Sequence, residues 1–467
     1  MLGSPAALLI FCFVHLCALF AAGHAVIYKR DSRSAATWVI LIVFVPLIGT
    51  LLYFWIGINR VRRRARGLRG KRSPRDSTNL PLPVNSHPAL VISGRINRAP
   101  LSSGNGVQLL VNGEQAFPRM LGAIAEAERT LSLATYIFDN DSVGREFAAA
   151  LNAAASRGVD VRVLVDAVGA RYSFPSIFRR LKGERLKSAR FLDTLFPWRF
   201  HYSQLRNHRK ILVADGRLAF VGGMNLREEH LVTRFEPGAT QDLHFQVEGP
   251  VVAEIQRVFA DDWDFATAEK LTGEGWFPSA LPVKGNTLAR VLTDGPDEDM
   301  EILRWTLLGA ISVAATSVRI LTPYFVPDQT LLQLLGLAVL RGVRVEICLP
   351  ARTNVFMVQW ASQALLWQVL ERGCKVFLSP APFDHSKLFI VDDAWALVGS
   401  ANWDARSLRL NFEIGLELED GPFVSGLTRE FEKKRDGALE LTLAQVDARP
   451  LWTRLRDGTA RLFSPYL

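Results

Sequence analysis

The sequence predicts an α/β fold made of two duplicated halves, preceded by a membrane-crossing helical hairpin. Three observations support this prediction. A short motif containing His and Lys occurs twice, a strand–helix–strand order occurs twice, and two long stretches near the N-terminus carry no charge. A chain of 467 residues is long enough for more than one domain with its own core.

The N-terminal region predicts two membrane spans. Residues 5–28 carry no charge, and neither do residues 35–59, so each stretch could cross a bilayer as a helix of roughly 20 residues. A secretory signal peptide is the alternative for the first stretch. That stretch lacks the basic start of such a peptide and leads directly into the second span. We therefore interpret residues 1–60 as a two-helix transmembrane hairpin, in whose second span Pro46 is tolerable.

A run of basic residues follows the hairpin. It contains no acidic residue and consists of Arg60, Arg62, Arg63, Arg64, Arg66, Arg69, Lys71, Arg72 and Arg75. These nine equal the formal net charge of +9, so the rest of the chain is balanced, with 46 basic and 46 acidic residues. Positive charge beside a span favours the cytoplasmic side and attracts anionic headgroups, by about 1 kcal/mol per residue. We expect a cytoplasmic catalytic domain; specific lipid binding and a simple topology signal both remain open for this run.

Residues 61–106 predict a linker, because they are rich in Arg, Pro, Ser and Asn and contain only short apolar runs. We expect this linker to become ordered toward its end. The four cysteines and the histidines show no spacing typical of a metal site. The sequence therefore favours neither a disulfide framework nor a bound metal.

The first half is predicted over residues 107–275. Residues 130–138 have the composition of a strand, residues 142–155 have helical apolar spacing, and Arg157-Gly158 ends that helix. A β-branched strand is expected over residues 159–165.

The second half is predicted over residues 276–467 and repeats this order. A strand over residues 317–326 is followed by a helix that ends at Leu340 and a strand over residues 343–349. Strand, helix and strand joined in this way form a βαβ unit, which requires parallel pairing and an α/β class.

The repeated motif occurs once in each half, at a separation of 177 residues. Both copies share a His, a Lys two residues on, an Asp five residues after the Lys, and then a Gly and an Asn at equal offsets. The first copy is His208, Lys210, Asp215, Gly222 and Asn225, and the second is His385, Lys387, Asp392, Gly399 and Asn402. This agreement at fixed spacing indicates an internal duplication in which each half supplies part of one phosphate-handling site.

Each motif is predicted to lie in a β-hairpin. Strand-like residues 204–214 lead to the turn pair Asp215-Gly216, and residues 385–391 lead to Asp392-Asp393. Residues two apart on a strand face the same side, so the His and Lys of each motif should project together. The two Asp residues lie at the turns, which favours a turn or scaffold role for them over direct participation.

The motif residues suit chemistry at a phosphodiester. Lys210, Lys387, Asn225 and Asn402 could neutralise its non-bridging oxygens, although the two Asn residues could instead be turn residues. Two imidazoles suit the remaining tasks of nucleophile and acid, because histidine titrates near neutral pH.

A histidine nucleophile needs its far ring nitrogen held by an acceptor. Asp242 and Glu413 lie on strand-like segments downstream of the two Asn residues and could serve, or could be ordinary polar strand residues.

Other features have more ordinary interpretations. Residues 171–200 mix basic and aromatic side chains and could form a membrane-contacting lip over the site. Their position between a strand and the motif hairpin favours a crossover helix instead. His201, His230 and His244 are predicted to be surface or scaffold residues.

Over residues 107–467 the paired motifs resemble the signature of the phospholipase D superfamily. Within that superfamily the chain is similar to bacterial cardiolipin synthases. The segments that support this, together with the N-terminal hairpin, are Arg206-Asn207-His208-Arg209-Lys210, Gly222-Gly223-Met224-Asn225, Thr322-Pro323-Tyr324-Phe325-Val326-Pro327, Asp404-Ala405-Arg406-Ser407, Asn411-Phe412-Glu413 and Ser464-Pro465-Tyr466-Leu467.

The resemblance implies that the two halves pack as a pseudo-dimer with one active site at their interface. It also implies catalytic motifs made of His208, Lys210, Asp215, His385, Lys387 and Asp392, with His208 as nucleophile and His385 as acid. A phosphatidyl group would pass from one phosphatidylglycerol to another through a phosphohistidine, releasing glycerol, with no metal or other cofactor. The expected location is the bacterial inner membrane, with the chain crossing it more than once.

One departure from the family pattern leaves the acceptor open. The second motif is approached through Phe383 and Asp384, where many such synthases have Gly-x-Leu before His-Ala-Lys. A phospholipase D-type hydrolase, or a transferase using another alcohol, is therefore the alternative function. We expect phospholipid and membrane partners and no nucleic acid, because the basic excess is confined to the juxtamembrane run; the intact motifs argue against a non-catalytic scaffold.

Overall fold

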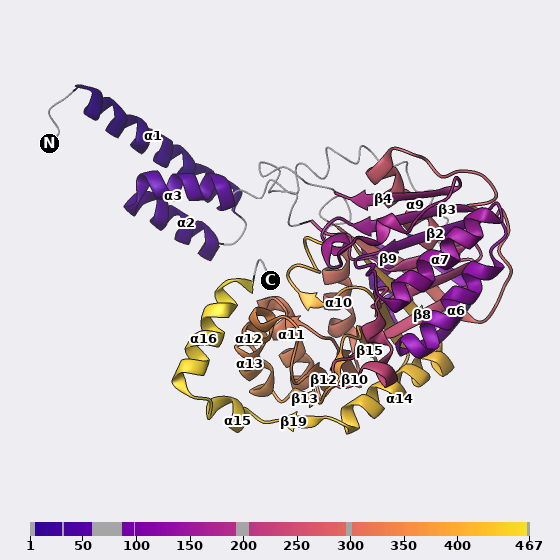
Figure 1. Cartoon of the computed structure of the whole chain (residues 1–467). Coiled ribbons are helices and arrows are strands. Elements are labelled where there is room, and N and C mark those ends of the chain that lie inside the picture. Colours follow the sequence, from indigo (N-terminus) through magenta and orange to yellow (C-terminus); the bar gives the residue numbers. More distant parts are fainter. Residues whose placement is uncertain are drawn as a thin grey trace. The chain divides into compact units, whose positions relative to one another are not determined.

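The computed structural model describes residues 5–29, 32–57, 86–97, 99–192, 205–295 and 301–464 (Figure 1). The chain forms two compact units, Met1–Leu68 and Arg69–Leu467. The basic run, His201 and most of the predicted linker lie outside the described residues.

The first unit consists of helices. They are α1 (Pro5–Tyr28), α2 (Ser32–Phe44), α3 (Pro46–Leu52) and a π-turn, η1 (Tyr53–Gly57). The helices contact one another through small or apolar side chains that include Ala18, Ala21 and Ala25 of α1 and Ile42 of α2. Most other side chains of α1 are apolar and exposed within the unit, as expected of a surface that faces lipid.

The second predicted span is not one continuous helix. It is interrupted at Val45, whose backbone angles (φ −132°, ψ 71°) are not helical, because Pro46 has no N–H to donate to the preceding turn. Within the described residues, α1 is the only helix that is both long and apolar enough to cross a membrane by itself.

The second unit is built on one large sheet, with fifteen strands among its described residues. The strand order is β19-β13-β12-β10-β15-β16-β18-β9-β1-β8-β6-β5-β2-β3-β4. Read outward from the central pair β9 and β1, the two directions show the same succession of seven strands, and β19 follows as an additional strand at the end of the second half. The duplicated α/β fold predicted from the sequence is therefore confirmed, and the two halves share a continuous sheet.

The strands of the first half are β1 (Ser102–Val111), β2 (Thr130–Thr135), β3 (Asp160–Asp166), β4 (Leu186–Phe191), β5 (Ile211–Ala214), β6 (Leu218–Gly222), β7 (Thr240–Gln241) and β8 (Leu243–Glu248). Its helices are α6 (Asn112–Glu126), α7 (Ser142–Ser156), α8 (Val232–Phe235) and α9 (Val252–Thr267). Helix α5 (Pro88–Ile96) precedes the first half along the chain and packs on the buried core of the second half. Strands β2 and β3 pair in parallel across α7, as the βαβ prediction requires.

The strands of the second half are β9 (Thr287–Asp294), β10 (Ser317–Leu321), β11 (Phe325–Val326), β12 (Arg344–Pro350), β13 (Lys375–Ser379), β14 (Phe383–Asp384), β15 (Leu388–Val391), β16 (Trp395–Gly399), β17 (Trp403–Asp404), β18 (Glu413–Glu419) and β19 (Leu439–Leu441). Its helices are α10 (Ile302–Val313), α11 (Gln329–Leu340), α12 (Phe356–Gln363), α13 (Leu366–Leu370), α14 (Gly421–Asp436), α15 (Leu443–Asp447) and α16 (Leu451–Leu462). The predicted βαβ unit is present as β10, α11 and β12, with parallel pairing.

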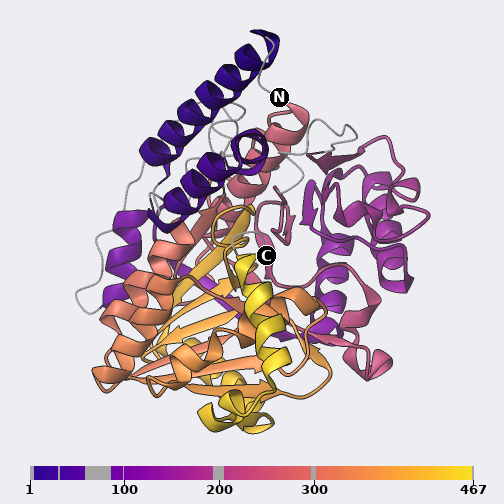
Figure 2. The ribbon, with the colours of Figure 1, turned by 90° about the vertical axis from the view of Figure 1, so that its left-hand side faces the viewer.

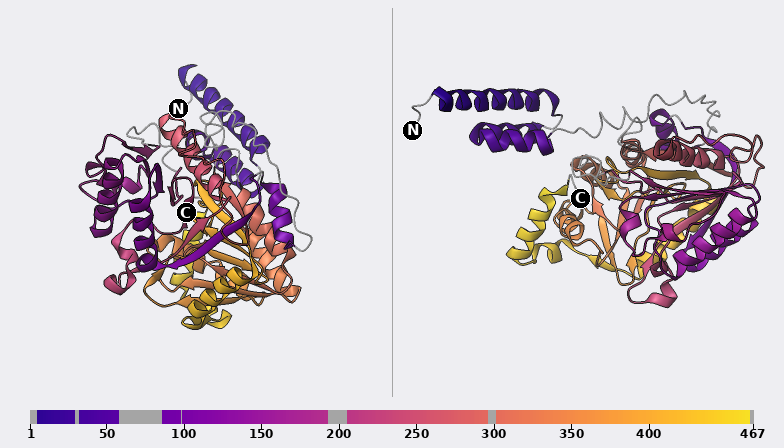
Figure 3. Two further views of the ribbon diagram at one scale, coloured as in Figure 1. Left: turned by 90° about the vertical axis from the view of Figure 1, so that its right-hand side faces the viewer. Right: turned by 45° about the horizontal axis from the view of Figure 1, so that its top comes forward.

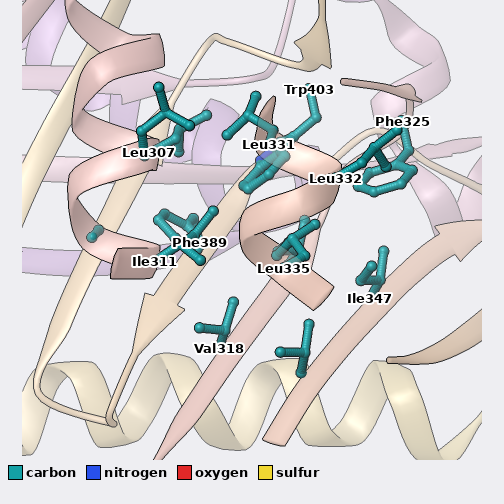
Figure 4. Packing of buried hydrophobic residues seen from close by; sticks show 14 of the residues in the cluster. Leu307, Ile311, Val318, Phe325, Leu331, Leu332, Leu335, Ile347, Phe389 and Trp403 are labelled. Atoms are coloured by element: carbon teal, nitrogen blue, oxygen red, sulfur yellow. The ribbon is translucent and has the colours of Figure 1, made fainter. Parts of the chain in front are cut away.

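Helices cover both faces of the sheet in the second half (Figures 2 and 4). On one face, Ile311 of α10 and Leu335 of α11 belong to the same buried cluster as Val318 and Ile347 of the strands. On the other face, the buried Arg319 of β10 forms ion pairs that reach α14. This alternation of side chains along β10 is what a sheet covered on both faces requires.

The crossover helix predicted over residues 171–200 is wrong for the described part of that segment. Up to residue 192 the chain forms two single 3-10 turns, η2 (Gly169–Arg171) and η3 (Ile177–Arg179), and then strand β4. Strand β4 pairs in parallel with β3 and ends the sheet, so the backbone donors and acceptors along one side of this segment bond to the sheet instead of within a helix. The predicted linker also ends in structure, because α5 and the start of β1 lie within residues 86–106.

Candidate active site

Both motifs lie just before the strands of their hairpins. Strands β5 and β15 begin at Ile211 and Leu388, whereas the sequence predicted strand through the His and Lys residues themselves. The antiparallel hairpins that follow, β5–β6 and β15–β16, are as predicted.

The segment that approaches each motif pairs with the opposite half. The N–H of His208 donates to the carbonyl of Phe412 (2.9 Å), and the N–H of His385 donates to the carbonyl of Gln241 (2.8 Å). Strand β14, immediately before His385, pairs in parallel with β7. Because of these backbone contacts, each motif lies at the interface between the two halves, which we call the seam, and not within its own hairpin.

Each motif histidine contacts a carboxylate from the other half. His208 Nδ1 lies 3.1 Å from Glu413 Oε2, and His385 Nδ1 lies 2.8 Å from Asp242 Oδ2. Because an ionised carboxylate only accepts hydrogen bonds, each Nδ1 carries a proton and each Nε2 is left with its lone pair. Asp242 and Glu413 thus lie where a carboxylate can orient a motif histidine, and each contacts the histidine of the opposite half.

Burial keeps both imidazoles neutral. Removal from water lowers the pKa of His208 below its usual value, and Lys387, Lys210 and His208 add to the same effect of burial at His385, whose pKa lies well below the usual range. A neutral imidazole with a free Nε2 is the form that can attack phosphorus.

The two motif lysines are buried beside the histidines. Lys210 Nζ donates to the carbonyl of His208 (2.7 Å), and Lys387 Nζ donates to the carbonyl of His385. Burial lowers the pKa of Lys210 to about 7 and that of Lys387 to about 8. Lys387 also lowers the pKa of Lys210, while Glu413 and Asp242 act in the opposite direction on both lysines. A bound anion would stabilise both ammonium groups, because it offsets their desolvation and their mutual repulsion.

Glu413 lies in a denser hydrogen-bond network than Asp242. It accepts hydrogen bonds from the Ser400 hydroxyl and from Asn411 Nδ2 (3.1 Å). Although burial alone would raise the pKa of Glu413, His208, Lys210 and Ser400 lower it overall. Burial raises the pKa of Asp242, which accepts the N–H of Leu243 (2.8 Å).

The two motif asparagines have different environments. Asn225 Oδ1 accepts a hydrogen bond from the N–H of Ile137 (3.2 Å), and this bond fixes the loop that contains Ile137. Asn402 is 5% exposed, and its Oδ1 has no hydrogen-bond partner among the described residues. Phosphate binding by the two remains a prediction, and the side-chain carbonyl of Asn225 is already engaged.

Asp215 and Asp392 lie outside the group formed by the histidines and lysines. Asp215 accepts the N–H groups of Glu128, Arg129 and Thr130, at 3.0, 2.7 and 2.8 Å. Asp392 accepts those of Ala315, Thr316 and Ser317 at 2.8, 2.7 and 2.9 Å. Each Asp therefore ties its hairpin turn to the segment that leads into the first strand of the βαβ unit. They belong to the scaffold, as the turn interpretation proposed, and not to the reacting groups.

The charge that Asp384 places beside the second motif is neutralised. Lys434 of α14 forms a buried ion pair with it (Nζ–Oδ2 2.6 Å), and Lys434 Nζ also reaches Gln241 Oε1 (3.2 Å). The ion pair outweighs burial and lowers the pKa of Asp384. The departure from the family pattern therefore adds a buried ion pair to the scaffold.

Sequence reasoning missed two tyrosines at the site. The rings of Tyr136 and His208 are 5.3 Å apart, and those of Tyr324 and His385 are 6.2 Å apart. Lys210 Nζ also lies 5.6 Å from the Tyr136 ring. Both tyrosines follow the first strand of a βαβ unit, in Thr135-Tyr136 and in Thr322-Pro323-Tyr324, and this position after a repeated strand is the signal that could have found them.

Three further polar residues near the motifs are buried: His230, His244 and Arg209. His230 and His244 are each 1% exposed, so they are scaffold residues and not surface residues; His230 Nε2 accepts the N–H of Asn225 (3.3 Å). Arg209, the residue between His208 and Lys210, is buried and forms an ion pair with Asp262 (2.6 Å).

Family models and individual relatives both show similarity to cardiolipin synthases. A family model described as "Cardiolipin synthase, PLD-like domain" matches residues 120–263 and 307–435, and one described as "Phospholipase_D-nuclease N-terminal" matches residues 7–57. The major cardiolipin synthase ClsA of Bacillus subtilis (strain 168) is 31% identical over 461 residues, which cover 94% of this chain and 95% of that protein. The cardiolipin synthase of Geobacillus kaustophilus (strain HTA426) is 30% identical over 451 residues, with 94% and 90% covered.

Among solved structures, the phosphatidylserine synthase of Haemophilus influenzae Rd KW20 has a similar fold. Its TM-score is 0.60 at 16% identity, and the match covers 81% of this chain and all of that one. With the paired motifs, the duplicated sheet and these relatives together, the chain belongs to the family of cardiolipin synthases with phospholipase D-like domains.

Proposed function

We propose that this protein is a phosphatidyltransferase that makes cardiolipin from two molecules of phosphatidylglycerol. The observation that carries the proposal is the pair of carboxylate-bound histidines beside two buried lysines at the seam between the halves. This arrangement supplies a nucleophile, an acid and a cationic site for the phosphodiester. Relatives named cardiolipin synthase match almost the whole chain, which supports the lipid substrate.

In the first step, the phosphodiester binds between Lys210 and Lys387. The Nε2 lone pair of His208 attacks phosphorus, a P–N bond forms, and the P–O bond to the headgroup glycerol breaks. His385 takes up a proton at Nε2 from solvent when the anionic phosphodiester binds, gives this proton to the departing oxygen, and glycerol leaves. The bound phosphodiester places a negative charge beside His385, which favours the imidazolium that this step needs.

In the second step, His385 is neutral and acts as a base. It takes the proton from a glycerol hydroxyl of a second phosphatidylglycerol, whose oxygen attacks phosphorus. The P–N bond breaks, cardiolipin forms, and His208 returns to its starting state. The same residue acts first as acid and then as base, as reversibility at one site requires.

The different surroundings of the two carboxylates support His208 as the nucleophile. Attack on phosphorus leaves a positive charge on the imidazole, which is stabilised by an ionised carboxylate at Nδ1. Glu413, which Ser400 and Asn411 also bond, is held in its ionised form. Burial disfavours ionisation of Asp242, so the carboxylate at His385 is less suited to stabilise that charge.

Product analysis tests the function. The purified full-length protein would be incubated with vesicles of phosphatidylglycerol, and the lipids and water-soluble products would be separated. Cardiolipin and glycerol in equal amounts are expected. Phosphatidic acid without cardiolipin would indicate a hydrolase, and no turnover in any phospholipid mixture would refute both.

The proposed location is the bacterial inner membrane, with both helical segments of the first unit spanning it and the catalytic unit in the cytoplasm. The nine basic residues between positions 60 and 75 support this orientation. Ser32→Cys, at the exposed first residue of α2, should react with an impermeant maleimide in cells whose outer membrane has been made permeable. Glu440→Cys, at an exposed side chain of the catalytic unit, should react only after lysis. The opposite labelling pattern would reverse the orientation, with the wild-type protein as the background control.

A further inference from the structure

Helix α16 lies at the C-terminal end of the second half (Figures 1 and 3). Five large apolar side chains on it and directly after it are exposed. The exposed fractions are 67% for Leu451, 80% for Trp452, 49% for Leu455, 73% for Leu462 and 50% for the following Phe463. Positions 451, 455 and 462 fall within about 40° of one another on a helix, with 452 and 463 beside them. The five side chains, which we call the α16 apolar face, thus lie on one side of the helix, together with the small polar side chain of Thr459.

Only basic side chains border this face among the exposed charged residues of α16. Arg456 lies on one side of it, and Arg454 and Arg461 lie on the other. The single acidic residue of the helix, Asp457, is 1% exposed and forms ion pairs with Arg449 (3.0 Å) and Arg456 (2.8 Å). The surface around the face is therefore positively charged.

A chain of contacts joins α16 to the second motif. Arg456 lies 4.6 Å from the ring centroid of Trp360 in α12, and Arg449 bonds Gln363 at the end of α12 (3.1 Å). These contacts order the two helices antiparallel, so the C-terminal end of α16 lies near the start of α12.

The residues at and just before the start of α12 connect this helix to Tyr324, beside His385. Phe356, the first residue of α12, is 60% exposed and packs on Trp360 with ring centroids 5.0 Å apart. Two residues before it, Asn354 accepts a hydrogen bond from the Tyr324 hydroxyl, and Tyr324 lies beside His385. Contacts between side chains thus run from α16 through α12 and Asn354 to Tyr324, which adjoins His385.

We propose that the α16 apolar face inserts into the surface of an anionic phospholipid bilayer, so that the catalytic unit makes its own membrane contact. A helix with apolar side chains on one face and arginines at its borders fits the boundary between headgroups and acyl chains. Trp452 suits that depth, and the arginines reach anionic phosphates while their stems stay in the apolar layer. The borders carry no exposed acid on α16, and this charge complementarity favours lipid over a protein partner. The link to catalysis rests on the proposed function, because a substrate that stays in the bilayer must reach the site from its surface.

Fluorescence quenching tests the insertion without relying on activity. The full-length protein would be placed in nanodiscs of phosphatidylglycerol and phosphatidylcholine brominated on the acyl chains. The signal of Trp452 is the difference between the wild type and Trp452→Phe, and we expect bromine to quench it. Trp305, which is 52% exposed on α10, is the matched control, and its signal should stay unquenched. An unquenched Trp452 would overturn the proposal.

A turnover experiment tests what the contact does. Leu455→Glu/Leu462→Glu should lower turnover of phosphatidylglycerol in vesicles by about tenfold or more, because charged side chains resist insertion. Turnover of a short-chain phosphatidylglycerol dispersed as monomers should not change. The control is Leu439→Glu, at a side chain 79% exposed on β19, which should behave as wild type on both substrates.

Other results distinguish the proposal from its alternatives. An equal loss on vesicles and monomers, or none on either, would contradict it. If Trp452 stays unquenched while the double variant shifts the mass of the detergent-solubilised protein, the face is a protein interface. If no phospholipid is turned over by the wild type and Trp452 is still quenched, membrane insertion stands and the proposed function fails.

Discussion

At the scale of single residues, each half of the fold controls the histidine of the other half. Glu413 of the second half bonds His208, and Asp242 of the first half bonds His385. Neither half therefore holds a complete pair of histidine and carboxylate. This exchange makes the site depend on correct packing of the halves, and it separates the effects expected from the two carboxylates.

Glu413→Gln should slow formation of the phosphohistidine. The change removes the negative charge that stabilises His208 as it attacks, and we expect a rate loss of about 10²- to 10⁴-fold. Single-turnover trapping of radiolabelled phosphatidyl-enzyme measures this step. Glu440→Gln, at an exposed surface position, is the control. An unchanged trapping rate would contradict the role given to Glu413.

Asp242→Asn should instead impair departure of the leaving group. With a phosphatidyl ester of 4-nitrophenol, the leaving group needs no proton, so the first step of this variant should recover to near the wild-type rate. Glu413→Gln should not recover on that substrate. If the two variants exchange these behaviours, His385 is the nucleophile and His208 the acid.

Because the two lysines are buried, we expect activity to decline at an unusually low alkaline pH, which we call the alkaline limit. Because burial lowers the pKa of Lys210 to about 7 and that of Lys387 to about 8, both are charged below these values and neutral above them. We expect kcat/KM, which reports the free enzyme, to fall as the pH rises from 7 to 8 and beyond. The profile of kcat should fall at higher pH, because bound phosphate stabilises the ammonium form. A kcat/KM that stays constant up to pH 10 would refute this prediction, and Lys210→Arg should move the limit upward.

At the scale of elements, the hairpins explain why Asp belongs to the repeated motif without touching the reacting groups. In each half the Asp at the turn accepts three successive N–H groups from the segment leading into β2 or β10. The hairpin is thereby fixed to the neighbouring βαβ unit. Asp392 also contacts His87 at the start of α5 (3.3 Å), a contact that the described part of the first half does not repeat at Asp215.

Asp392→Ala should therefore destabilise the catalytic unit. The change removes one acceptor shared by three N–H groups, which are exposed or partly buried, and a hydrogen bond of this kind contributes about 0.5–1.5 kcal/mol. We expect a lower midpoint in thermal or denaturant unfolding. These hydrogen bonds lower the pKa of Asp392, so its contribution is present at neutral pH and is lost as the pH falls below the value of the unfolded chain, near 4. Asp436→Ala, at an exposed surface pair, is the control and should have little effect. Equal midpoints for the two variants would contradict the scaffold role.

At the scale of the whole catalytic unit, a buried cation helps to join the halves. Arg209 pairs with Asp262 of α9, and its side chain also donates to the carbonyls of Glu413 (3.0 Å) and Asp294 (3.3 Å) in the second half. The equivalent position in the second motif is Ser386. The residue between His and Lys varies between the copies because it faces different surroundings in each half, and not because it is free.

Arg209→Ser, which introduces the residue of the other motif, should destabilise the unit by about 3–5 kcal/mol, because Asp262 would lose its buried counter-charge. Arg209→Ser/Asp262→Asn should recover part of this loss, because no charge is then buried without a partner. Denaturant unfolding in detergent measures both. A single variant as stable as the wild type would show that Arg209 does not help to hold the halves together.

Much of the molecule follows from the sequence by itself. The repeated His and Lys at fixed offsets, the repeated strand–helix–strand order and the charge-free N-terminal stretches determine a duplicated α/β unit with a helical anchor. They do so because helix and strand periodicities and turn residues are local properties of the chain. The break at Pro46 and the strand that replaces the expected crossover helix are exceptions, and in both the arrangement of backbone donors decides the outcome.

Only the tertiary structure decided which carboxylate serves which histidine. Along the chain, Asp242 follows the first motif and Glu413 follows the second, so local order would pair each with its own half. Each instead serves the opposite half, because the approach segments of the motifs bond to the backbones of Gln241 and Phe412 across the seam. Such contacts join residues more than 140 positions apart and depend on the packing of two complete halves, which no local pattern in the sequence encodes.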